Sequence, residues 1–292
     1  MWSCSVESSP SASPAGRSRV ERSDRAPIVV CVLGMSRSGT SLTTQVLNLA
    51  GVYLGPTDEL LGEDLRQLNQ ADATTLARAS DTNPKGFWEH YRIMRLNERI
   101  LRRLGGSWRE PPPLPVGWER SEDLAEERRE ARALLDRNFA GRSIWGWKDP
   151  RNSLTLPFWK SLLPEMRYVI CTRNPQDVAA SLRRRDGMSL EQAAHLWCVY
   201  VASALAVTSG GLRFFVPYER YFEDRRAIAS RLAAFVGCDG AFDGDDARRR
   251  LTEAVDERLW RNRAGADRAG GESRLGAAAL SLHRLTERLA AV

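Results

Sequence analysis

The feature that most constrains the fold of this chain is a glycine-rich loop at residues 34–41, with the sequence GMSRSGTS. The loop comes directly after an apolar run at residues 28–33 and directly before a helical pattern that begins at Leu42. This order predicts a strand, a tight turn and the start of a helix. Glycines let the backbone turn sharply, so several N–H groups and the positive end of the helix converge on one point. We therefore expect the loop to bind a phosphate group.

The loop departs from the nucleotide-binding pattern G-x-x-x-x-G-K-[ST] at one important position. Gly34, Gly39 and Ser41 match the pattern, whereas Thr40 stands in place of the lysine. In nucleoside-triphosphate enzymes that lysine reaches the β- and γ-phosphates beside a magnesium ion. The cation of this loop is instead Arg37, so the loop is expected to suit a different phosphate ester.

The composition indicates one folded domain preceded by a polar tail. The chain has 292 residues, of which 42% are hydrophobic and 27% are charged, which favours one sizeable α/β domain. Residues 1–26 are rich in Ser, Pro and Arg and lack the apolar core of a secretion signal. We predict a disordered tail at residues 1–26 and a single domain at residues 27–292, with a helical C-terminal region from about residue 238 and a mobile segment at 264–276.

Charge and cysteine content argue against several classes of protein. The net charge of +6 is spread along the chain without a basic arm, so no nucleic acid is expected as a partner. The five cysteines include no C-x-x-C pair, which fits a reducing, cytoplasmic location. The segment 192–212 carries no charge but contains several polar side chains, which favours a buried helix over a transmembrane segment.

Strand and helix patterns alternate along the chain. Four apolar strand patterns occur, at residues 28–33, 143–147, 167–172 and 212–218. Their alternation with helical patterns predicts an α/β fold, with a P-loop-like parallel sheet flanked by helices on both faces. In such sheets ligands bind at the carboxyl ends of the strands. We therefore expect the glycine-rich loop, Lys148 and Arg173 to share one edge of the sheet.

Capping signals and periodicity predict several helices. Asn174 is a suitable N-cap and Pro175 suits the first helical position. Ser189 and Gln192 have the spacing of a capping box. Charged amphipathic or polar-faced patterns predict further helices at residues 59–79 and 121–138.

Four short motifs together carry a family resemblance. The first two are the G-x-x-R-S-G-T-S loop at 34–41 and Arg173 followed eight positions later by Ser181. The other two are Gly-Phe-Trp-Glu at 86–89 and Lys-Asp-Pro-Arg at 148–151. In these motifs the chain resembles the sulfotransferases that use 3′-phosphoadenosine 5′-phosphosulfate (PAPS), especially their bacterial branch. The resemblance spans residues 28 to about 236 and implies the sulfotransferase fold, PAPS as co-substrate, no metal, and a hydroxyl acceptor.

The resemblance also implies roles for the matching residues. The loop would bind the 5′-phosphosulfate, and Arg173 with Ser181 would bind the 3′-phosphate. Residues implied in cofactor binding are Gly34, Ser36, Arg37, Ser38, Gly39, Thr40, Ser41, Arg173 and Ser181. Sulfuryl transfer needs in-line positioning and stabilisation of charge. Arg37 and Lys148 are therefore expected to stabilise the sulfonyl oxygens and the leaving 5′-phosphate.

Three side chains are candidates for the base that accepts the acceptor's proton: Glu89, Asp149 and His90. Glu89 is preferred, because its stretch resembles the acidic base of glycan-modifying relatives, and Asp149 is expected to orient Lys148. Purely structural alternatives stay open for these residues. Glu89 could complement a helix dipole, Lys148 could simply pair with Asp149, and Arg173 could form a salt bridge.

Two other functions stay open at this point. A P-loop kinase-like phosphotransferase could use Asp149 for magnesium but lacks the loop lysine, and a non-catalytic nucleotide-binding protein would need only the loop and Arg173. The resemblance implies a small-molecule or glycan acceptor, and no sequence pattern indicates a particular oligomeric state. Trp108 is the candidate wall of the acceptor site, whereas Trp145 and Trp147 are expected in the core. Arg261 and Arg263 are candidates for the adenine side.

Overall fold

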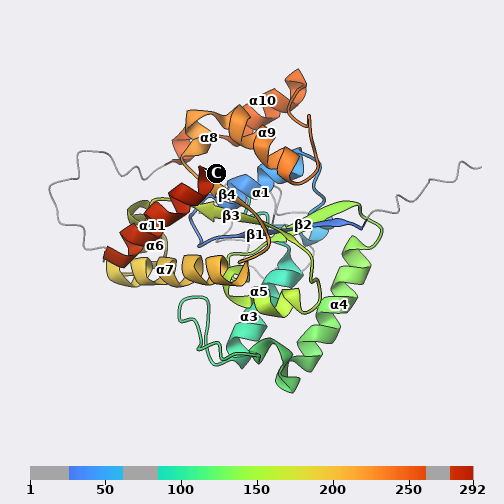
Figure 1. Ribbon diagram of the computed structural model, residues 1–292, viewed down its shortest axis with the longest axis vertical. Coiled ribbons are helices and arrows are strands. Elements are labelled where there is room, and N and C mark those ends of the chain that lie inside the picture. The colour runs from blue at the N-terminus through green and yellow to red at the C-terminus, as the bar shows by residue number, and fades with distance from the viewer. Residues whose placement is uncertain (1–25, 62–84, 261–276, 292) are drawn as a thin grey trace, which may run out of the picture.

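The structure is a computed structural model that describes residues 26–61, 85–260 and 277–291. Four strands form one parallel sheet in the order β2-β1-β3-β4 (Figure 1). The strands are β1 (Ile28–Leu33), β2 (Ile144–Lys148), β3 (Arg167–Thr172) and β4 (Leu212–Pro217). This confirms the predicted parallel α/β sheet. The predicted tail, nearly all of the helix at 59–79, the segment at 264–276 and both Arg261 and Arg263 lie outside the described residues.

Helices cover both faces of the sheet, as the sequence predicts. The layer above the sheet in Figure 1 contains α1 (Thr40–Leu49), α8 (Arg220–Glu223), α9 (Arg225–Phe235) and α10 (Asp245–Ala254). The layer below it contains α3 (Tyr91–Arg103), α4 (Ala125–Phe139), α5 (Asn152–Lys160) and α7 (Leu190–Val207). The remaining helices, α6 (Pro175–Asp186) and α11 (Ala277–Ala290), both pack against α7.

The central strand β1 connects the two layers because its side chains alternate between the faces of the sheet. Val30 and Val32 pack in one core with Val46 of α1. Cys31 and Leu33 pack in the other, with the tryptophans of β2 and α5. The three valines, Cys31 and Leu33 are at most 1% exposed, and each large apolar side chain buried in this way contributes about 1.5–3 kcal/mol to folding. The fold therefore holds the start of the glycine-rich loop rigidly.

Local signals set most of the helix ends. The Asn174 side chain accepts a hydrogen bond of 2.9 Å from the Gln176 amide at the start of α6. Ser189 and Gln192 form the predicted capping box of α7, with two bonds of 3.1 Å. The helix expected at 121–138 differs at its start, because a short 3-10 segment occupies Glu122–Leu124 and α4 begins at Ala125. A separate 3-10 segment precedes it at Trp118–Arg120. Another 3-10 turn occupies Thr57–Glu59.

The helix α7 is long and apolar enough to cross a membrane when only length and composition are considered. Of its residues, 39% are buried. Ala193, Leu196 and Trp197 are at most 2% exposed and belong to a core shared with α6. The packing of this face of α7 is that of a core helix.

Candidate active site

The glycine-rich loop depends on two glycines that have no room for a side chain. Gly34 has a φ angle of +133°, and a Cβ there would lie 2.5 Å from the carbonyl oxygen of Cys171 on β3. Gly39 has a φ angle of +85°, and a Cβ there would lie 2.4 Å from the ring of Tyr218. Arg37, with a φ of 74°, is a non-glycine residue in the same left-handed region. Close packing against β3 and the end of β4 therefore requires these glycines.

The loop contacts the predicted 3′-phosphate residues directly. The Arg37 Nε donates to Ser181 Oγ at 2.9 Å, across from the loop to α6. Arg173 Nη1 donates to the carbonyl oxygen of Arg37 at 3.2 Å. Arg173 and Ser181 are only 6% and 3% exposed. The neighbouring strands β1 and β3 thus bring two motifs that lie about 140 residues apart together at one edge of the sheet.

Aromatic residues after β4 complete this end of the site, and the sequence motifs did not identify them. The Arg173 guanidinium lies over the Tyr218 ring at 4.4 Å from its centroid. Phe222 stacks on Trp260 with a centroid distance of 4.4 Å. Tyr218 and Phe222 line the same cavity as the loop. The signal in the sequence was the position of Tyr218 at the end of the fourth strand pattern, close to the signal that marked Arg173 directly after the third.

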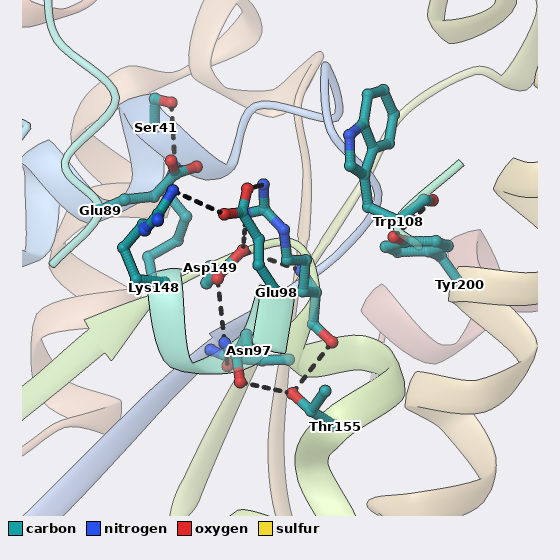
Figure 2. Close-up of polar contacts among 12 residues, drawn as sticks. Ser41, Glu89, Asn97, Glu98, Trp108, Lys148, Asp149, Thr155 and Tyr200 are labelled. Atoms are coloured by element: carbon teal, nitrogen blue, oxygen red, sulfur yellow. Dashed lines mark hydrogen bonds and ion pairs between the residues drawn. The ribbon is translucent and has the colours of Figure 1, made fainter. Parts of the chain in front are cut away.

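A buried ion pair occupies the other end of the loop. Lys148 Nζ donates to Glu89 Oε1 at 2.7 Å, and it also lies 3.5 Å from Ser41 Oγ (Figure 2). Lys148 is 1% exposed and Glu89 is 8% exposed. Burying a single charge without a partner is very unfavourable, so each of these side chains offsets the cost of burying the other. The partner of Lys148 is therefore Glu89, and the expected pair of Lys148 with Asp149 is not formed.

Backbone pairing positions Glu89. The Leu61 amide donates to the Glu89 carbonyl at 2.9 Å, and the Trp88 amide donates to the Leu61 carbonyl at 2.7 Å. Between these bonds, Trp88 has a φ angle of 60°, which is rare for a bulky residue. A strained residue of this kind is held in place by its surroundings. The strain at Trp88 therefore accompanies the turn that directs the Glu89 side chain to Lys148.

Asp149 belongs to a buried network below the site. Asp149 Oδ1 accepts from Arg151 Nη1 at 2.9 Å, and Oδ2 accepts from Asn97 Nδ2 at 2.9 Å. Asn97 Oδ1 in turn accepts from Thr155 and Trp159, each at 2.9 Å. Asp149 is 0% exposed and does not line the cavity. Because both of its oxygens are engaged, the geometry argues against the predicted catalytic role of Asp149 and favours one in positioning Arg151.

His90 is also directed away from the cavity. Its Nε2 lies 3.2 Å from Glu59 Oε2 and 2.9 Å from Asn138 Nδ2, behind the Glu89 segment. Burial lowers the pKa of His90 to about 4, and the charges of Arg92 and Arg137 act in the same direction against the opposing effect of Glu59. Of the three candidate bases, only Glu89 lines the cavity.

A cavity of about 430 Å³ joins these parts, within the range of small-molecule sites. The predicted site residues that line it are Ser36, Arg37, Gly39, Thr40, Ser41, Glu89, Lys148 and Arg173. The predicted site residues that do not line it are Gly34, Ser38, Asp149 and Ser181. The Gly34 amide is already bonded to Ser153 Oγ at 3.1 Å. Among the described residues, no group of three or more His, Cys, Asp and Glu could hold a metal.

The far end of the cavity has a different chemistry. Trp108 lines it, and its carbonyl oxygen accepts from Tyr200 Oη at 2.9 Å; both side chains lie apart from Glu89 and Lys148 in Figure 2. Glu98 on α3 accepts from Arg151 Nη2 at 2.9 Å. Burial alone would lower the pKa of Arg151, but Asp149 and Glu98 raise it above its ordinary value. Sequence reasoning missed the Glu98 and Arg151 pair, because only the packing of α3 on α5, which Arg151 directly precedes, creates it.

The expected packing of the strand tryptophans is confirmed. Trp145 and Trp147 are 5% and 1% exposed and stack at 5.8 Å between ring centroids. The site is therefore built on a rigid aromatic layer below β2.

With this geometry in place, comparison with known proteins assigns the class. The sequence model of the Sulfotransferase family matches residues 27–243. The chain therefore belongs to the sulfotransferase family. No curated protein matches the sequence.

The chain is also similar to solved structures, and the first of the following three supports the same fold. The sulfotransferase domain of the Synechococcus PCC 7002 olefin synthase is 18% identical, with 92% of this chain and 98% of that chain covered and a TM-score of 0.50. The sulfotransferase domain from the curacin biosynthetic pathway is 14% identical, with 90% and 99% covered and a TM-score of 0.48. Sulfotransferase STF1 from Mycobacterium tuberculosis is 14% identical, with 92% and 78% covered and a TM-score of 0.46. The fold is that of the sulfotransferases.

The network around Asn97 predicts a large effect on stability. Replacing Asn97 by Leu removes the hydrogen-bond partner of Asp149 Oδ2 and of the buried donors Thr155 Oγ1 and Trp159 Nε1. We therefore expect the free energy of unfolding to fall by about 3 kcal/mol or more. Urea unfolding measures this loss. Arg95→Ala on the exposed side of the same helix is the control and should cost less than about 0.5 kcal/mol. Equal effects of the two substitutions would show that the network does not stabilise the fold.

The buried His90 predicts a dependence of stability on pH. The pKa of about 4 in the folded protein lies below the usual value of about 6.5, so the unfolded chain binds more protons between these values. Stability should therefore fall by about 2 kcal/mol as the pH is lowered from 7 to 5. Urea unfolding at both pH values should show that His90→Gln reduces this fall, whereas substitution of the exposed His195 leaves it unchanged. If stability fell by the same amount between pH 7 and pH 5 in His90→Gln as in the unaltered chain, the low pKa of His90 would be contradicted.

Proposed function

We propose that this sulfotransferase moves the sulfuryl group of PAPS to a hydroxyl of a small-molecule or glycan acceptor. The observation that carries the proposal is the direct contact between two regions suited to anions, at the carboxyl-end edge of the sheet beside the cavity. One region is the glycine-rich loop after β1, and the other is Arg173 with Ser181 after β3. PAPS carries an anionic group at both its 5′ and its 3′ positions, so it matches this arrangement better than ATP does.

The residues of the chain fit this donor. The loop residues Thr40 and Ser41 lie at the start of α1 and line the cavity, where a helix N-terminus favours an anion. Arg173 offers a planar guanidinium, which suits a doubly charged terminal phosphate. Phe222 and Tyr218 give an aromatic wall beside these groups, which is suited to the face of a base.

In the proposed reaction, the acceptor oxygen attacks sulfur in line with the bridging oxygen of PAPS. The bond between sulfur and that bridging oxygen breaks, and a new bond forms between sulfur and the acceptor oxygen. The electron pair of the broken bond remains on the 5′-phosphate of adenosine 3′,5′-bisphosphate. The hydroxyl proton passes to Glu89, and the Lys148 ammonium stabilises the charge that develops on the leaving oxygen. In this proposal cationic side chains stabilise the developing negative charge, and no metal ion takes part.

Glu89 is the base that the geometry favours. It lines the cavity and pairs with Lys148 at 2.7 Å, whereas Asp149 and His90 are enclosed. The end of the cavity with Trp108, Glu98 and Arg151 would then hold the body of the acceptor. A cytoplasmic location stays a prediction.

Ligand binding tests the choice of donor. We expect adenosine 3′,5′-bisphosphate to bind at least about tenfold more tightly than ATP, because only the former has the phosphate that Arg173 and Ser181 suit. Isothermal titration calorimetry measures the affinity of the chain for each of the two nucleotides. Tighter binding of ATP would favour the kinase-like alternative.

Turnover tests the two proposed catalytic residues. With a labelled donor and a panel of hydroxyl acceptors, mass spectrometry should detect transfer. Glu89→Gln should lower kcat by about 100-fold or more, because a general base contributes about that much. Lys148→Met should lower kcat far more than it lowers affinity for the bisphosphate, since its charge acts mainly on the transition state. Near-normal transfer by Glu89→Gln would eliminate it as the base, and absence of transfer by the unaltered chain to every acceptor would favour a binding protein.

A further inference from the structure

The far end of the cavity is built from two segments that are distant in the sequence. Trp108 and Arg109 belong to the loop that follows α3, whereas Arg185 and Asp186 belong to the last turn of α6. All four residues line the cavity. Trp108 lies beside Tyr200 in Figure 2, and its carbonyl oxygen accepts a hydrogen bond of 2.9 Å from the Tyr200 hydroxyl. The proposed function places the body of the acceptor at this end.

The loop that carries Trp108 and Arg109 is fixed by its own hydrogen bonds. Ser107 Oγ accepts from the amides of Arg109 and Glu110, at 3.2 and 3.1 Å. The Ser107 amide donates to the Glu110 carbonyl oxygen at 2.9 Å, and a Cβ at Gly106 would lie 2.5 Å from that same oxygen. The backbone of Trp108 and Arg109 is thus held in one position, which lowers the cost of ordering it around a ligand.

Two positive side chains share one negative partner in this wall. Arg109 Nη2 donates to Asp186 Oδ1 at 3.1 Å, and Arg185 Nε donates to Asp186 Oδ2 at 2.7 Å. Arg185 and Asp186 are 19% and 12% exposed, and Arg109 is 44% exposed. The set therefore carries one positive charge in excess, in a place that is partly withdrawn from water.

The Trp108 ring brings these two cations together. The Cζ atom of Arg109 lies 5.0 Å from the ring centroid, and the Cζ atom of Arg185 lies 5.7 Å from it. An indole ring attracts a cation through its quadrupole but carries no net charge. The ring thus holds two like charges at one wall without neutralising them, and an anion bound beside them would lower their repulsion.

The other charged side chains that line the far end are balanced. Arg151 donates to both Asp149 and Glu98, and Arg95 lies 3.7 Å from the second oxygen of Glu98. Two acids are thus matched by two bases. Among the described residues at this end of the cavity, the excess positive charge lies at the two guanidinium groups over the indole ring.

We infer that the acceptor of this chain is a hydroxyl compound that also carries a carboxylate, and that Arg109 and Arg185 bind this carboxylate. The inference rests on the proposed function, in which the hydroxyl group of the acceptor lies at Glu89. A planar guanidinium group donates paired hydrogen bonds to a carboxylate, and a single negative charge matches the single positive charge in excess. Arg109 and Arg185 are then residues that determine acceptor specificity.

The test compares hydroxyl compounds that differ in the carboxylate. One pair is 4-hydroxyphenylacetate and its amide, and the other is methyl glucuronide and methyl glucoside. Isothermal titration calorimetry measures the affinity of the full chain for each compound in the presence of saturating adenosine 3′,5′-bisphosphate. We expect the carboxylate to bind at least about tenfold more tightly than its neutral counterpart in one pair or both, as for hydrogen bonds to a charged group.

Variants assign this preference to the two arginines. Arg109→Met and Arg185→Met should each reduce it to within about threefold, because either change removes the excess charge. Arg109→Glu should reverse it, since like charges repel, and the exposure of Arg109 makes this variant the safer one for folding. Arg183→Met removes the same charge from an exposed position of α6 that does not line the cavity, so this control should leave the preference unchanged.

The outcomes separate this inference from the proposed function. Equal affinities within both pairs, binding of none of the four compounds, or a preference that Arg109→Glu leaves intact would overturn the inference. Transfer from labelled PAPS to the neutral compounds would at the same time leave the proposed function standing. Conversely, tight binding of a carboxylate that Arg185→Met abolishes, without sulfate transfer to any hydroxyl acceptor, would keep the carboxylate site and overturn the proposed function.

Discussion

The close packing of the glycine-rich loop on strand β3 and on Tyr218 is the constraint on which the site depends. A side chain at Gly34 or Gly39 would overlap atoms of these neighbours. Because the backbones approach so closely, Arg37 on the loop is within hydrogen-bonding distance of Arg173 and Ser181. The two regions proposed to bind anions are thus parts of one rigid unit, held by the strands β1 and β3.

The second property of the site is that its buried charges are paired. Lys148 pairs with Glu89, and Arg151 pairs with both Asp149 and Glu98. Such pairs require each other, since a single charge left buried is strongly unfavourable. In the proposed reaction, transfer of a proton to Glu89 would neutralise the partner of Lys148. The ammonium would then be available to the leaving phosphate at the moment when negative charge develops there, so the two steps support each other.

Much of the fold was predictable from local patterns. The four strands, the parallel sheet and the caps at Asn174 and Ser189 follow from the order of apolar runs and from capping residues. The rule that parallel strands present ligands at their carboxyl ends also placed the loop, Lys148 and Arg173 at one edge. The start of the helix predicted at 121–138 differed, because the hydroxyl of Ser121 bonds to the amide of Asp123 at 3.3 Å and favours a 3-10 turn.

Residue type and strand order alone fix which chemical groups are present, the sulfotransferase class that they resemble and the edge of the sheet at which they meet. The pairing of the charges, in contrast, depends on the folded structure. In the folded chain Lys148 donates a hydrogen bond to Glu89, and Asn97 donates one to the buried Asp149. Arg37 donates to Ser181. The physical reason is that a hydrogen bond depends on distances of a few ångströms between segments far apart in the chain, and only the packing of helices on the sheet sets these distances.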